Sequence, residues 1–109
     1  MATLKIMQGD AYSIPIEITA SNGTTLNDTT IEDVEITLGK FTKTLKSNEI
    51  VYNFSDSVFE FPLTQEETFQ LKAYKYDLIV RVKVAENQVI GFKLKDYIEV
   101  ETSTSKVVL

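Results

Sequence analysis

The stretch from Val58 to Val84, VFEFPLTQEETFQLKAYKYDLIVRVKV, decides the fold that this chain is expected to adopt. In Phe59–Leu63, large apolar residues alternate with glutamate and proline, a period of two that is typical of a β-strand with one buried face. Strict alternation returns in Tyr76–Val84 and predicts the longest strand of the molecule. The chain therefore crosses one end of a sheet between these strands and returns through the core.

A short helix is expected to link these two strands. Thr64 and Glu67 have the spacing of a capping box, in which each side chain accepts a hydrogen bond from the backbone N–H of the other residue. Because alternation resumes soon afterwards, the helix is confined to about residues 64–72. Leu71 and Tyr76 then have the pattern of a tyrosine corner, in which a Tyr hydroxyl bonds back to the upstream connection, and Tyr74 is the alternative candidate.

Outside this stretch, short alternating segments follow one another at intervals typical of an all-β sandwich. They are Leu4–Gln8, Tyr12–Ile18, Val34–Leu38, Phe41–Leu45, Ile50–Phe54 and Ile90–Val100. The predicted fold is an immunoglobulin-like antiparallel β-sandwich of about eight strands with one short helix. We expect residues 1–102 to form one domain and residues 103–109 to form a C-terminal tail. A bulge or turn is expected near Lys95–Asp96, because unbroken alternation would bury the Asp96 carboxylate.

Composition limits the chemistry that the chain can carry. The 109 residues include no Cys and no His, so thiol nucleophiles, disulfides and imidazole catalysis are excluded. The net charge of −5 disfavours binding to nucleic acid, and no stretch has the roughly 20 apolar residues that a membrane span needs. No cofactor or metal is expected, since the acidic groups around Glu32–Glu35 and Asp96–Glu101 lack a calcium-loop pattern and are interpreted as solvated.

No pairing of a nucleophile with a base is recognisable, so an enzyme is not expected. Ser103 and Lys106 have a Ser-x-x-Lys spacing, but they lie in the predicted tail and not at the start of a buried helix. Four aromatic residues are expected to lie in the core, because each occupies an apolar position of the alternation in its predicted strand: Phe59, Phe61, Tyr76 and Phe92.

Two segments are candidate protein contacts. Pro15 lacks an N–H group, so its strand, which also carries Tyr12, is expected either to lie at the edge of a sheet or to have the nitrogen of Pro15 facing away from a partner strand. At an edge, another chain could add a strand. Protection of that edge against pairing is the alternative role of Pro15. Val107, Val108 and Leu109 form an apolar end that is expected to fray or to pair with a neighbour.

Three motifs carry a resemblance to a known family. The opening run LKIMQGDAYSIPI (Leu4–Ile16), the strand end FEFPLT (Phe59–Thr64) and the later YDLIV (Tyr76–Val80) resemble the N-terminal domain of phage baseplate upper proteins, which are encoded by prophages of Gram-positive hosts. The resemblance implies a non-enzymatic structural module of a phage tail. Such a module would dock on other tail or baseplate proteins through sheet edges and loops and would form homo-oligomers during assembly.

This function would place the protein in the virion, and in the bacterial cytoplasm before assembly. The alternative function is a carbohydrate-binding or cell-surface adhesion module built on the same fold. That alternative would need exposed aromatic side chains for sugar stacking, and the chain has no Trp.

Overall fold

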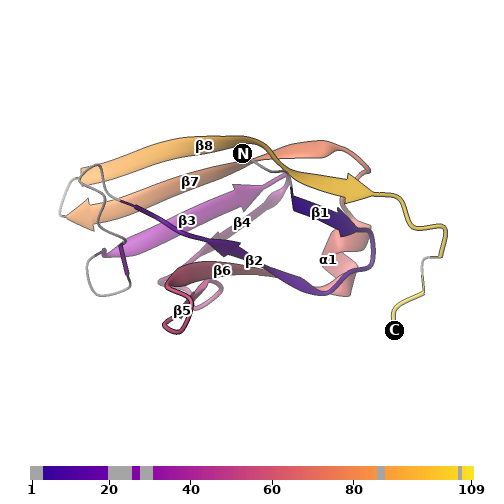
Figure 1. Cartoon of the computed structure of the whole chain (residues 1–109), viewed down its shortest axis with the longest axis horizontal. Coiled ribbons are helices and arrows are strands. Elements are labelled where there is room, and N and C mark those ends of the chain that lie inside the picture. The colour runs from indigo at the N-terminus through magenta and orange to yellow at the C-terminus, as the bar shows by residue number, and fades with distance from the viewer. Residues whose placement is uncertain (1–3, 20–25, 28–30, 86–87, 106) are drawn as a thin grey trace.

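The computed structural model describes residues 4–19, 26–27, 31–85, 88–105 and 107–109 (Figure 1). Eight strands and one helix occur in these ranges: β1 (Leu4–Met7), β2 (Tyr12–Ile16), β3 (Asp33–Leu38), β4 (Phe41–Thr44), β5 (Val51–Asn53), β6 (Val58–Leu63), α1 (Gln65–Phe69), β7 (Lys75–Ala85) and β8 (Gln88–Glu101). The predicted all-β sandwich with one short helix is therefore confirmed.

The strands form two layers. One sheet has the order β1-β8-β7-β3-β4, and the other has the order β2-β6-β5. Figure 1 shows the larger sheet above the smaller one, with α1 at one end of the molecule and the β7–β8 hairpin at the other. Apart from β1, this is the strand order of immunoglobulin-type sandwiches. The strands β8-β7-β3-β4 correspond to G-F-C-C′ of that fold, and β2-β6-β5 correspond to B-E-D.

Two details of the predicted topology are wrong. The pair β1–β8 is parallel, so the sandwich is not purely antiparallel. Two strands far apart in the chain can pair in either direction, and local alternation carries no information about which direction they take. The longest strand is β8, with 14 residues, whereas β7 has 11. A bulge allows β8 to continue past the point where the alternation breaks.

The core lies between the layers and consists of the inward residues of both sheets. The largest side chains that are fully buried there are Phe59, Phe61, Ile14, Ile36, Leu38, Ile50, Leu78 and Ile98. Both Phe residues of β6 belong to this group, as their alternation predicts. The predicted position of Phe92 in the core is wrong, because 37% of this residue is exposed.

Helix α1 begins at the predicted capping box. The Glu67 N–H donates to Thr64 Oγ1 at 3.2 Å, and the Thr64 N–H donates to Glu67 Oε1 at 2.9 Å. The helix spans five residues and ends at Phe69, earlier than the predicted 64–72, because the following segment bends so that Leu71 enters the core. Partial burial raises the pKa of Glu67. Hydrogen bonds from Thr64 and Lys43 and the Lys43 charge outweigh that effect and lower the pKa below its usual value.

The helix is held against the turn between β1 and β2. Thr68 is fully buried, and its hydroxyl donates to the Asp10 carbonyl at 2.8 Å while accepting from the Gly9 N–H at 2.9 Å. Gly9 has φ +93°, and a Cβ there would lie 2.6 Å from the Phe69 ring. A glycine is therefore required at this turn for both its backbone conformation and its close contact with the helix.

The predicted tyrosine corner is present and uses Tyr76. Its hydroxyl donates to the Lys72 carbonyl at 2.9 Å and so ties the start of β7 to the connection after α1. Tyr74, the alternative candidate, has 68% of its surface exposed and packs edge-on against the Tyr76 ring. Among the described residues, no helix is long and apolar enough to cross a membrane.

Candidate protein-interaction site

One edge of β8 is covered by β1 only at its C-terminal end. Strand β1 pairs with the last four residues of β8, from Leu4 opposite Ile98 to Met7 opposite Glu101. On its other side, β8 pairs with β7 along most of its length. Within the part of the chain that the structure describes, the segment Gln88–Leu94 therefore has a strand on one side only. The backbone groups on its other side, which no strand among the described residues pairs, are a template for an added strand.

A bulge separates the covered end of β8 from the open segment Gln88–Leu94. Asp96 has φ +50°, and the register between β7 and β8 shifts between Tyr76 and Leu78. The Asp96 N–H donates to Asp77 Oδ1 at 2.8 Å, which anchors this distorted turn of the strand. The predicted bulge near Lys95–Asp96 is thus confirmed, and it marks where the open segment ends.

An apolar groove lies beside the open segment, between the two sheets. Its cavity volume is about 310 Å³, and it is lined by Ile18, Thr19, Leu26, Val82, Val84, Ile90 and Phe92. Ile90 and Phe92 are paired with Val82 and Val80, which are buried, and therefore point to the inner face of the sheet. Even so, 58% of Ile90 and 37% of Phe92 remain exposed. The smaller sheet does not cover this side of the sandwich completely.

The predicted edge position of Pro15 is confirmed, because β2 is the outer strand of the smaller sheet. Pro15 is exposed, and Tyr12, at the opposite end of β2 from the groove, pairs with Leu63 next to α1. The role of both residues as protein contacts stays a prediction. The continuation of this strand reaches the groove, where Ile18 is part of the lining.

The apolar tail residues lie at the other end of the molecule, beside α1 (Figure 1). The Gln65 side-chain amide holds the backbone of Leu109, since its Nε2 donates to the Leu109 carbonyl at 3.0 Å and its Oε1 accepts from the Leu109 N–H at 2.7 Å. The side chains of Val107, Val108 and Leu109 remain exposed. The structure therefore does not bring the two predicted contact segments together at one site, and the tail does not form a strand of the described sheets.

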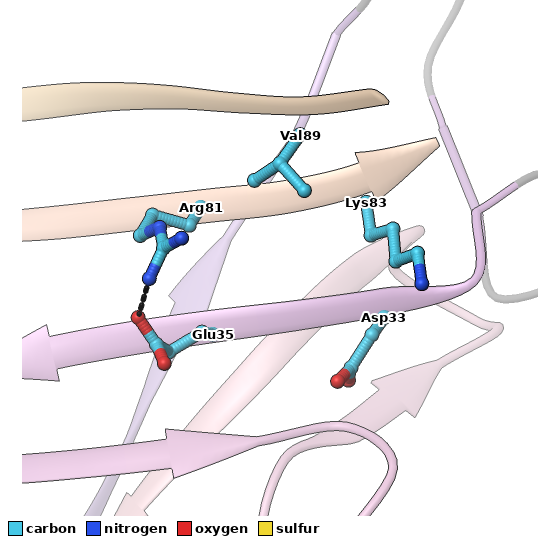
Figure 2. Close-up of a pocket in the computed structure, with 5 residues that line it drawn as sticks. All are labelled: Asp33, Glu35, Arg81, Lys83 and Val89. Carbon is cyan, nitrogen blue, oxygen red and sulfur yellow. Dashed lines mark hydrogen bonds and ion pairs between the residues drawn. The ribbon is translucent and has the colours of Figure 1, made fainter. Parts of the chain in front are cut away.

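A second hollow lies on the outer face of the larger sheet and is polar. Figure 2 shows it lined by Asp33 and Glu35 from β3, Arg81 and Lys83 from β7, and Val89 from β8. Arg81 Nη1 lies 3.3 Å from Glu35 Oε1 across the two strands. Asp33 Oδ1 accepts backbone N–H groups of Val34 and Lys46.

These charges are engaged in cross-strand pairing and local backbone bonds, and they explain the hollow without a ligand. Exposed pairs of this kind contribute about 0–1 kcal/mol each to stability. Among the described residues, no group of three acidic side chains is arranged to hold a metal ion. The hollow therefore has the properties of a solvated sheet face.

The groove residues Ile90 and Phe92 were not recognisable as a site from the sequence, because their alternation is that of core residues. A weaker signal was present. Gly91 interrupts the strand, and Lys93 and Lys95 follow it, a combination of glycine and lysines that is typical of edge strands. The comparisons with known proteins add no candidate, since no family model, curated protein or solved structure matches the chain.

Proposed function

We propose that this protein is a non-enzymatic assembly module of a phage or prophage tail, in the baseplate region, that docks on other tail proteins by strand addition. The docking site is the open segment Gln88–Leu94 of β8 together with the apolar groove beside it. In this proposal the protein belongs to the virion and resides in the bacterial cytoplasm before assembly.

The observation that carries the proposal is the coincidence of a free strand edge and an exposed apolar groove. An added strand would form main-chain hydrogen bonds with the open segment, and these bonds supply affinity with little sequence dependence. Its alternate side chains would enter the groove against Ile90 and Phe92, and this contact supplies selectivity. Burial of that exposed apolar surface favours association at roughly 25 cal/mol per Å² before the costs of ordering are counted.

The class of partner comes from the sequence. The runs Leu4–Ile16, Phe59–Thr64 and Tyr76–Val80 resemble the N-terminal domain of baseplate upper proteins. The composition supports a role without catalysis, because a chain without His or Cys lacks the usual general base and thiol nucleophile.

The test is an affinity capture of tagged protein from a lysate of the host bacterium after prophage induction, read by mass spectrometry. The wild-type protein is expected to enrich tail or baseplate proteins. Ile90→Asp places a charge in the groove and is expected to reduce that enrichment about tenfold or more, since an unpaired carboxylate resists burial.

The matched control is Val51→Asp. Val51 lies on β5, at the far edge of the smaller sheet, and is 56% exposed, close to the 58% of Ile90. This control is expected to capture tail proteins like the wild type. Enrichment of cell-surface proteins without virion proteins, together with hits on a glycan array, would replace the proposal with the adhesion function. Equal capture by Ile90→Asp and wild type would move the docking site away from β8.

A further inference from the structure

The open segment of β8 has a defined beginning and a defined end. It begins at Gln88, the first residue of β8, and it ends before the bulge at Asp96 and the residues from Ile98 onward, which β1 covers. Gly91 lies at the midpoint of Gln88–Leu94. A strand that fills this space symmetrically would therefore be centred opposite Gly91.

The glycine at this midpoint has no internal explanation. Its φ is not in the left-handed region, and a Cβ at Gly91 would meet only Arg81 Cγ at 3.6 Å and the Val80 carbonyl at 3.7 Å, which are ordinary contacts. Glycine inside a strand weakens the strand, because it adds backbone entropy and no side-chain packing. A glycine retained inside a strand often marks a place where another backbone approaches closely.

The segment is complementary to itself. In an antiparallel pair of two β8 strands with Gly91 opposite Gly91, Ile90 of each copy lies opposite Phe92 of the other. Both residues point to the inner face, where 58% and 37% of their surfaces are exposed in a single copy. The two-fold axis repeats this apolar pair twice, so one interface covers the exposed residues of both grooves.

The charges of the segment are compatible with this register. On the outer face, Lys93 of one copy lies opposite Val89 of the other and not opposite a second lysine. The two Lys93 residues are about 14 Å apart at the usual rise per residue. That separation exceeds the Debye length of about 8 Å at physiological salt, so their repulsion is largely screened.

The arrangement also leaves the existing strand pairs in place. Because β1 covers only Ile98–Glu101, the second copy occupies the part of the edge that β1 leaves open. In the dimer, the larger sheets of the two copies join through their β8 strands into one continuous sheet. Both smaller sheets then lie on the same face of that continuous sheet.

From these observations we infer that the first occupant of the open edge is a second copy of this chain, paired through β8 in the register centred on Gly91. The inference rests on the proposed function in using the same docking site, and it names the partner. The second copy and the strand of a tail protein would occupy the same edge in turn, so the dimer would dissociate when the protein enters the tail assembly.

The test is sedimentation velocity over a range of protein concentrations, with the variants Gly91→Lys and Gly91→Asp. Wild type is expected to form a dimer as concentration rises. Each variant places two like charges directly opposite one another at the two-fold axis, and we expect about tenfold or greater weakening of dimerisation. An equimolar mixture of the two variants is expected to restore dimers, since Lys then faces Asp. The ordinary contacts at this position predict that both variants fold, which their thermal unfolding checks.

Each outcome distinguishes the register from the wider function. Dimerisation of the Gly91→Lys variant alone at wild-type strength would overturn the register, and a wild type that stays monomeric at all concentrations would overturn self-pairing. If that monomer still captured tail proteins and Ile90→Asp abolished the capture, the proposed function would stand and self-pairing would be rejected. A dimer with the expected charge dependence that captured no tail protein would support self-pairing and reject the proposed function.

Discussion

At the scale of single residues, Tyr76 shows how one hydroxyl connects separate parts of the sandwich. Its hydrogen bond to the Lys72 carbonyl ties the segment after α1 to the first residues of β7. The ring packs against Tyr74 at a centroid distance of 5.6 Å. The hydroxyl and the ring therefore make separate contacts, and a substitution can remove one without the other.

Tyr76→Phe is expected to lower the free energy of unfolding by about 1 kcal/mol, because it removes the hydrogen bond and keeps the ring contact. Urea unfolding measures the change. Tyr74→Phe is the matched control and is expected to stay within about 0.5 kcal/mol of wild type, since Tyr74 is exposed. Equal losses for the two variants would show that the corner bond does not stabilise the fold.

At the scale of elements, the end of the tail is attached to α1, and the tail forms no strand of the described sheets. Gln65 holds the Leu109 backbone through two hydrogen bonds, and the Ser103 N–H donates to Gln8 Oε1 at 3.2 Å. The apolar side chains of the tail add little, because they remain exposed. Two exposed hydrogen bonds are nearly offset by the conformational entropy lost when the tail is ordered.

Deletion of residues 107–109 is therefore expected to change the free energy of unfolding by less than about 1 kcal/mol, as measured by thermal or urea denaturation. Gln65→Ala is expected to give a similarly small change, because it removes the same two bonds. If the tail is a contact in the assembled virion, the deletion also reduces capture of tail proteins. A loss of more than about 2 kcal/mol would show that the tail belongs to the folded core.

At the scale of the whole molecule, the two ends of the sandwich differ in how well the inner face of β8 is covered. Near α1, β1 covers the edge of β8, and Ile98 is fully buried. Toward the other end of the molecule, no strand in the described ranges pairs with the same edge, and Ile90 and Phe92 on the inner face are partly exposed. Phe61 and Phe92 each lie at an inward-facing position of their own strand, but Phe61 is fully buried whereas Phe92 is 37% exposed.

Phe61→Ala is expected to lower the free energy of unfolding by about 3–5 kcal/mol, because it leaves a cavity in a fully buried site. Phe92→Ala is expected to cost about 1 kcal/mol in dilute solution, since the side chain is partly exposed and its loss leaves no closed cavity. Urea unfolding of both variants makes the comparison. A loss for Phe92→Ala as large as that for Phe61→Ala would show that the groove is closed in solution.

Much of the fold could be predicted from local patterns. The strand β6, the capping box at Thr64, the tyrosine corner at Tyr76 and the bulge near Asp96 were each predictable, because each depends on residues close together in the chain or on the cost of burying a charge. The edge position of Pro15 was predictable for the same reason, since proline lacks the N–H that a central strand must donate.

The sequence by itself determined that the chain forms an all-β sandwich and which side chains point inward, because alternation reports the face of a strand. Only the tertiary structure decided whether that face is covered. Phe92 has the parity of a core residue, yet it is exposed because β1 is too short to cover the whole edge of β8 and the smaller sheet does not reach it. Strand order, the parallel β1–β8 pair and the open edge depend on contacts between distant segments. Such contacts leave no periodic signal in the sequence, so the candidate site became visible only in the folded molecule.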